Sequence, residues 1–221
     1  MIERANLYRV IHKGVRVALS RLSAEAGRTD FGEPVELARL RQMAVATFQL
    51  LDEHASVEDR FVVPLLVRAA PEVAAKIDAD HRSMEEMAKV LWRMFDVVAQ
   101  AGAAAPREGH ALVLQLSRYQ ATQLSHMADE EELAMAALWR AFGDDTLLRV
   151  HGEIAASVSP EVMAGMLALV LPSANARERA ELIRGIQGPP AVFERVLRIA
   201  EESLEAGDFA RLEHDLRPRA A

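Results

Sequence analysis

Apolar residues recur every three or four positions along the first two-thirds of the chain, which is the period of α-helices that bury one side. Gly27 and Gly143 supply helix stops, and Pro34 and Pro71 stand where a first helical residue tolerates a missing N–H. No stretch alternates apolar and polar residues as a half-buried strand does. The pattern therefore predicts four long helices, at about residues 3–26, 34–69, 71–101 and 106–142.

Short loops between these helices predict an all-α fold, an up-down-up-down four-helix bundle. Pro64 lies inside the second helix, where it removes a backbone hydrogen bond, so we expect a kink in the last turns of that helix. The segment from Gly102 to Pro106 is expected to turn the chain back into the fourth helix.

Beyond the bundle the helical segments become short and are separated by breaks that contain proline or glycine. We expect four or five short helices between residues 144 and 217, packed against the bundle, with Ser159 and Asp208 starting two of them. The predicted domains are a bundle over residues 1–142 and a helical C-terminal extension over residues 143–221. The apolar extension is also a candidate homodimer interface.

Candidate chemistry lies on the apolar faces of the four long helices. Two of them carry a histidine followed four residues later by a glutamate, so both side chains project from one helix face. A neutral imidazole beside a carboxylate on an apolar stripe is costly to bury unless something binds both, and a metal ion is the obvious candidate. Each pair is preceded by one more histidine on an apolar stripe. The six candidate metal ligands are His12, His54, Glu58, His81, His126 and Glu130.

Composition narrows the kind of site. The chain has 221 residues and no cysteine, which excludes disulfides, thiolate zinc sites, cysteine-ligated iron–sulfur clusters and cysteine nucleophiles. Any metal must therefore use imidazole and carboxylate. A net charge of −7 without a basic stripe argues against nucleic acid as a partner. The N-terminus does not read as a signal peptide, and the longest apolar run, residues 162–171, is too short to span a membrane, so we expect a cytoplasmic protein.

The spacing also separates two classes of metal-binding bundle. Ferritin-like di-iron bundles use a Glu-x-x-His step on two helices. This chain has no such step, only Asp78-x-x-His81 once, and uses His-x-x-x-Glu instead. With these residues the chain resembles the hemerythrin-like (HHE cation-binding) domains, over roughly residues 5–140. The matching motifs are Ile11-His12-Lys13-Gly14-Val15-Arg16, Glu53-His54 through Glu58-Asp59 to Pro64-Leu65-Leu66, Asp80-His81, and His126 through Glu130-Glu131.

The resemblance implies two iron ions with an oxo or hydroxo bridge inside the bundle, and a C-terminal extension of the kind found in longer bacterial relatives. It assigns His12 and His54 to one ion, His81 and His126 to the other, and Glu58 and Glu130 to both as bridges. Each ion would then have four protein ligands, which leaves a position for dioxygen, peroxide or nitric oxide. Zinc, manganese or nickel are alternative metals for such a donor set.

One feature departs from the oxygen-carrying hemerythrins, which have a fifth histidine one turn from the ligand on the third helix. Here position 77 is Ile and position 85 is Glu. Four histidines favour a ferric centre that binds oxygen less reversibly, so simple oxygen transport is not expected. Glu85 is either a further ligand or a solvated residue. Tyr8 and Tyr119 lie on the inner face, where they either hydrogen-bond an exogenous ligand or pack in the core.

Acidic residues next to the candidate ligands either accept the second N–H of a ligating imidazole or form a solvated helix edge. They are Glu53, Asp59, Asp80, Asp129 and Glu131. The leading functional hypothesis is a metal-binding protein that senses, stores or scavenges oxygen, nitric oxide or iron, with no catalytic residue assigned. The alternative is a di-iron redox enzyme, a peroxidase, an oxidase or a nitric-oxide-related repair protein. That enzyme would need a substrate channel and a redox partner, and the sequence shows neither.

Overall fold

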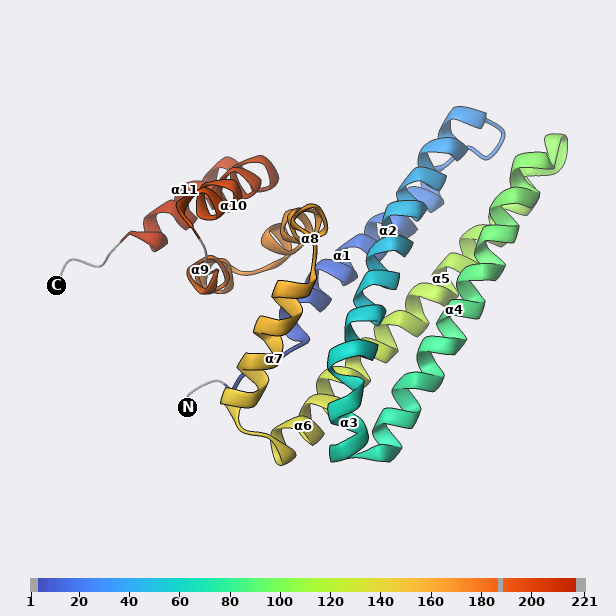
Figure 1. The fold of residues 1–221 in the computed structure, drawn as a ribbon. Coiled ribbons are helices and arrows are strands. Elements are labelled where there is room, and N and C mark those ends of the chain that lie inside the picture. Colours follow the sequence, from blue (N-terminus) through green and yellow to red (C-terminus); the bar gives the residue numbers. More distant parts are fainter. Residues whose placement is uncertain (1–3, 187–188, 218–221) are drawn as a thin grey trace. The chain divides into compact units, whose positions relative to one another are not determined.

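The computed structural model describes residues 4–186 and 189–217, and every regular element within these ranges is a helix (Figure 1). The all-α fold is therefore confirmed. By compactness the chain divides into two units. The bundle unit comprises Met1–Tyr8 and Ala18–Ile154, and the C-terminal unit comprises Arg9–Val17 and Ala155–Ala221. The domain boundary predicted after residue 142 stays a prediction.

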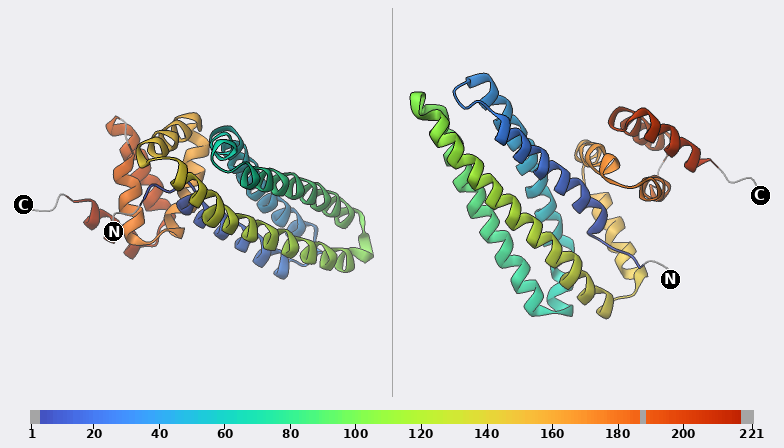
Figure 2. Two further views of the ribbon diagram at one scale, coloured as in Figure 1. Left: turned by 90° about the horizontal axis from the view of Figure 1, so that it is seen from below. Right: turned by 180° about the vertical axis from the view of Figure 1, so that it is seen from behind.

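Four long helices build the bundle, as the apolar periodicity predicts. The turns that join the first to the second and the third to the fourth lie at the same end of the bundle, so the helices run alternately up and down (Figures 1 and 2). The second and fourth helices both pack against the third. These helices are α1 (Arg9–Arg28), of which Ala18–Arg28 belongs to the bundle unit, α2 (Pro34–Phe61), α4 (Pro71–Gln100) and α5 (Ala105–Asp129).

The first helix begins later than predicted, at Arg9 instead of near residue 3. The preceding segment is not helical because its polar groups bind elsewhere in the bundle unit. The guanidinium of Arg4 donates to the backbone oxygen of Trp139 at 2.7 Å, and the Trp139 indole N–H donates to the backbone oxygen of Ala5 at 2.7 Å. These contacts hold Tyr8 in place immediately before the helix, with 2% of its surface exposed.

The kink expected at Pro64 is a break in the helix. Helix α2 ends at Phe61, and a separate helix, α3 (Val63–Ala69), has the proline in its first turn, where the missing N–H costs nothing. The backbone N–H of Val62 still donates to the backbone carbonyl oxygen of Glu58 at 2.8 Å, so the helix breaks one turn after that glutamate.

The fourth helix is interrupted as well, and nothing in the sequence pattern predicts this. After α5 the chain passes through a π-helical segment, η2 (Glu130–Ala134), and returns to α-helix in α6 (Met135–Ala141). Such segments carry a wider turn and occur frequently at functional sites. Here the π-helix begins at one of the candidate ligands.

Two glycines shape the opposite end of the bundle. Gly102 has a φ of +52°, in the left-handed region that favours glycine, and it opens the short 3₁₀ turn η1 (Gly102–Ala104) between α4 and α5, as expected for this segment. Gly109, buried on α5, lies directly against the ring of Phe31 from the α1–α2 loop. A side chain at position 109 would occupy the space of that ring.

The short helices expected after the bundle are present: α7 (Asp144–Ser157), α8 (Pro160–Ser173), α9 (Ala176–Gly185), α10 (Pro190–Ser203) and α11 (Ala206–Leu216). Ser159 caps α8 by accepting a hydrogen bond from the Val162 N–H, as predicted. The predicted start at Asp208 is wrong, because α11 begins at Ala206 and the Asp208 carboxylate instead pairs with Arg179 at 2.8 Å. That these helices pack against the bundle stays a prediction.

The C-terminal unit has an apolar core of its own, in which α8 packs against α10 and α9 against α11. Its buried members are Leu167, Leu171, Ala180, Ile183, Val196, Ala200, Leu204 and Leu212. Among the described residues no single helix is long and apolar enough to cross a membrane, although α7 and α8 taken together would pass that test by length and composition alone.

Candidate metal centre

Both histidine–glutamate pairs lie on the faces that their spacing predicts. On α2, His54 Nε2 is 3.1 Å from Glu58 Oε1. At the junction of α5 and η2, His126 Nε2 is 3.2 Å from Glu130 Oε1. Both glutamates are buried, with 3% of Glu58 and none of Glu130 exposed. Each helix therefore presents one imidazole and one carboxylate, side by side, to the interior.

The third helix completes a group of four inside the bundle unit. His81 Nε2 on α4 is 3.1 Å from His126 Nε2, 3.5 Å from Glu58 Oε2 and 3.9 Å from Glu130 Oε1. One ligand atom from each of these four residues lies within 4.8 Å of the others. Two imidazole Nε2 atoms that face each other beside two carboxylates form a donor set that fits a metal cation.

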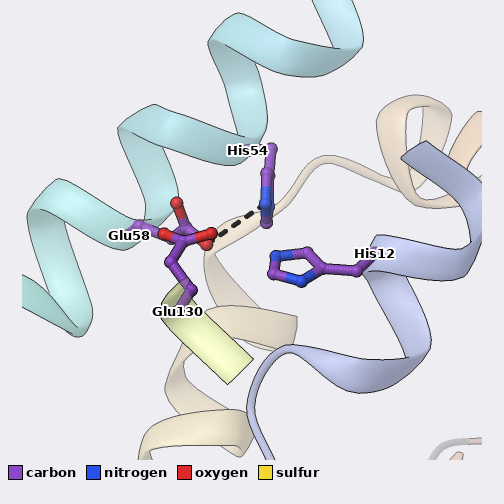
Figure 3. A group of neighbouring side chains, drawn as sticks. All are labelled: His12, His54, Glu58 and Glu130. Atoms are coloured by element: carbon purple, nitrogen blue, oxygen red, sulfur yellow. Dashed lines mark ion pairs between the residues drawn. The ribbon is translucent and has the colours of Figure 1, made fainter. Parts of the chain in front are cut away.

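A second group meets the same distance criterion and contains the remaining two histidines (Figure 3). It consists of His12, His54, Glu58 and Glu130. Figure 3 draws these four side chains, with the ion pair between His54 and Glu58 as a dashed line. Glu58 and Glu130 belong to both groups, and the two groups together contain all six residues that the sequence singles out. That they bind metal stays a prediction.

The charge of the site favours a cation. Burial alone would lower the pKa of His81, but the hydrogen bond to Glu58 and the charges of Glu58, Glu130 and Asp59 raise it to about 9. Burial first, and then the charges of Glu58 and Glu130, raise the pKa of Tyr8 well above its ordinary value. Both shifts have the same origin, since two carboxylates in a poorly solvated interior stabilise positive charge and oppose further negative charge.

The outer nitrogens of two histidines face aspartates. His81 Nδ1 is 3.1 Å from Asp59 Oδ1, and His126 Nδ1 is 3.5 Å from Asp80 Oδ2. An Nδ1–H that donates to a carboxylate leaves the Nε2 lone pair for the interior, which is the usual arrangement of a metal-bound histidine. Two of the acidic neighbours thus lie beside the outer nitrogen of a histidine, each time on a different helix from that histidine.

Comparison with protein families matches residues 5–138 to the hemerythrin HHE cation binding domain, which is well over half of the chain and includes all six candidate ligands. This chain belongs to the hemerythrin HHE family. Neither the curated proteins nor the solved structures contain a match to it. The family match and the two groups of histidine and glutamate side chains both support the binding of metal cations.

Other side chains of this hemerythrin HHE domain stand apart from both groups. The Glu85 carboxylate is 63% exposed and pairs with Lys89 at 2.7 Å, so the structure favours a solvated residue at this position over a further ligand. Tyr119 is buried and its hydroxyl accepts a hydrogen bond from Gln123 at 2.9 Å, as a core residue would. His110 and His151 are exposed.

Two features of the hemerythrin HHE site were not predicted from the sequence. The π-helix at Glu130 left no signal, because the apolar pattern continues through it. Lys76 has no role predicted from the sequence either, although its ammonium lies 2.7 Å from both Asp80 and Asp129. Its spacing of four residues from Asp80 on α4 is a visible signal. The contact with Asp129 joins two helices, so the spacing of residues along the sequence does not predict it.

Proposed function

We propose that this hemerythrin HHE domain holds two metal ions, with iron as the metal. The observation that carries the proposal is that two groups of two histidines and two glutamates share the same pair of glutamates. In this arrangement His12 and His54 would hold one ion, His81 and His126 would hold the other, and Glu58 and Glu130 would serve both.

The donor set supports iron among the first-row metals. Imidazole with carboxylate suits iron and manganese, and zinc or nickel compete for the same donors on affinity alone. Four protein ligands leave each ion short of the five or six that iron prefers. A di-iron centre held by these residues would supply an open coordination position for dioxygen, peroxide or nitric oxide.

The surrounding residues would hold such a centre and keep it dry. Val62 and Ala134, each one turn beyond a bridging glutamate, pack with Tyr8 in one buried cluster. Because burial and the two glutamates raise the pKa of Tyr8, its phenol stays protonated at neutral pH and keeps an O–H to donate. Asp59 and Asp80 hold two of the imidazoles in the orientation that binding requires.

The function that this supports is sensing, storing or scavenging a small ligand or iron itself. The side chains of the five candidate ligands within the bundle unit are at most 11% exposed. A diatomic molecule or peroxide reaches such a centre more readily than an organic substrate does, because a larger molecule must first displace the buried side chains around it.

Elemental analysis and visible absorption spectra of the purified protein test the proposal. We expect two irons per chain and a charge-transfer band that changes on exposure to oxygen or nitric oxide. His54→Ala should reduce the iron content to at most one ion, whereas His110→Ala, an exposed histidine outside both groups, should leave it at two. Protein without metal, or His54→Ala protein with both ions, would show that the assignment is wrong.

A further inference from the structure

We propose that Lys76 is a positioning residue that holds the two candidate ligands contributed by α5 and η2. It acts on His126 through Asp80 and on Glu130 through Asp129. The inference rests on the proposed function, since it concerns how the dinuclear centre is supported.

The ammonium group of Lys76 joins two helices at the site. Its Nζ atom lies 2.7 Å from Asp80 Oδ2, one turn further along α4, and 2.7 Å from Asp129 Oδ2, the last residue of α5. A single Lys76 side chain therefore fixes one carboxylate on each helix. Both aspartates are next to candidate ligands, Asp80 before His81 and Asp129 before Glu130.

Lys76 contacts His126 indirectly, through the carboxylate of Asp80. Asp80 uses the same oxygen, Oδ2, toward Lys76 and toward the outer nitrogen of His126, at 3.5 Å. The Asp80 side chain is 30% exposed, so without Lys76 it is able to turn toward water and release the imidazole.

Lys76 is connected to Glu130 through Asp129, the residue immediately before it. Asp129 is the residue at which the α-helix ends, and the wider π-helical turn begins with Glu130. The direction of the Glu130 carboxylate depends on where that change of helix type takes place. By holding the Asp129 side chain to α4, Lys76 fixes the backbone immediately before the change.

The effect on the two ions should be unequal. His81 and His126 belong to one group, and the partner of His81, Asp59, makes its contact from α2. Loss of Lys76 removes the support of His126 directly and that of the shared Glu130 indirectly. The ion bound by His12 and His54 feels only the second change, so one of the two binding steps should weaken much more than the other.

A merely structural role predicts a different result. Lys76 has 43% of its side chain exposed, and ion pairs of that kind contribute little to the stability of a fold. Helix α4 offers a matched control in Lys89, which is 49% exposed and also has two acidic partners, Glu85 at 2.7 Å and Glu86 at 2.8 Å. Neither partner of Lys89 contacts a candidate ligand in the described part of the chain.

The test is an anaerobic titration of the metal-free protein with Fe(II) against a competing chelator, repeated with Co(II), whose visible bands report coordination. For Lys76→Met we expect the affinity of one of the two binding steps to fall at least about 10-fold. This is the smaller of the effects usual for residues that support metal ligands. Asp80→Asn should act in the same direction and Lys76→Arg should restore most of the affinity. Lys89→Met should bind both ions as the wild type does, and thermal melts of the metal-free proteins should agree closely.

The outcomes separate the inference from the proposed function. If the wild type binds two ions and Lys76→Met binds both as tightly, the positioning role of Lys76 is overturned and the dinuclear centre stands. If Lys76→Met loses both steps equally together with its melting temperature, the residue is structural and the inference is again overturned. A wild type that does not take up two ions overturns the proposed function, and the inference with it.

Discussion

Glu58 and Glu130 differ from the four histidines in one respect: each belongs to both groups of candidate ligands, whereas each histidine belongs to one. In the proposed dinuclear centre, removal of a shared carboxylate should therefore affect both ions, and removal of a histidine should affect mainly one. Both glutamates are buried, so no other acidic side chain can take their place from solvent.

This difference predicts the behaviour of two variants. Glu58→Gln keeps the size of the side chain but exchanges an anionic ligand for a neutral amide, so it should take up neither ion firmly. His54→Ala should still retain one, bound by His81 and His126. Iron per chain by elemental analysis distinguishes the two. Equal iron content in the two variants would contradict a shared role for Glu58.

At this scale the sequence was sufficient to predict the geometry of the two histidine–glutamate pairs and insufficient to predict the contacts around them. Spacing of four residues on a helix placed His54 with Glu58 and His126 with Glu130, because the helix itself fixes that geometry. Asp59 and Asp80 were recognised as acidic neighbours, yet each contacts a histidine on another helix. Which side chain an aspartate reaches across a helix boundary depends on packing that no single helix encodes.

Among the elements, the contact between α5 and the α1–α2 loop at Gly109 allows a simple test. Gly109→Ala should lower the free energy of unfolding by about 1–3 kcal/mol, because the new methyl group needs the space of the Phe31 ring. Chemical denaturation of the metal-free protein measures the change.

Gly152, in the middle of α7, is the matched control, since a methyl group there meets nothing within 4 Å. Gly152→Ala should raise the stability by about 0.5–1 kcal/mol, because alanine loses less backbone entropy in a helix than glycine. Destabilisation of similar size in both variants would refute the role given to Phe31.

The helices themselves were predicted well where proline and glycine mark their ends, and less well elsewhere. Pro34 and Pro71 begin helices as expected, because a first turn needs no N–H from them. The late start at Arg9 could not be predicted, since it results from contacts of Arg4 and Ala5 with a residue more than 130 positions away. The π-helix at Glu130 was missed for a similar reason, because apolar periodicity does not distinguish one wide turn.

At the scale of the molecule, Glu178 connects distant parts of the sequence within the C-terminal unit. Its carboxylate accepts hydrogen bonds from Lys13 at 2.6 and 2.7 Å and from the backbone N–H of Asn175 at 2.9 Å. Burial opposes the charge, but the hydrogen bond of Lys13, the Asn175 N–H and the charges of Lys13 and Arg9 together lower the pKa of Glu178.

A lowered pKa predicts a pH dependence with a definite sign. Glu178 contributes stability that is fully present above its unfolded pKa of 4.5 and is lost as the pH falls through the lower folded value. Glu178→Gln keeps a side chain suited to the capping box but removes the charge. Its unfolding free energy should be about 1 kcal/mol lower than that of the wild type at pH 7 and should converge with it toward pH 3. Parallel curves from pH 7 to pH 3 would contradict the ion pair.

The breaks in α2 and in the fourth helix give the candidate centre a mechanical asymmetry. Each of the two shared glutamates lies next to an interruption of the regular α-helical hydrogen bonding. Glu58 is one turn before the break at Val62, and Glu130 is the first residue of the π-helix. His81 lies in the uninterrupted middle of α4, and His126 is held by Asp80. His81 and His126 are therefore held more rigidly than the two carboxylates. In the proposed centre, a change in the charge of the ions should move the two carboxylates more than it moves these two imidazoles.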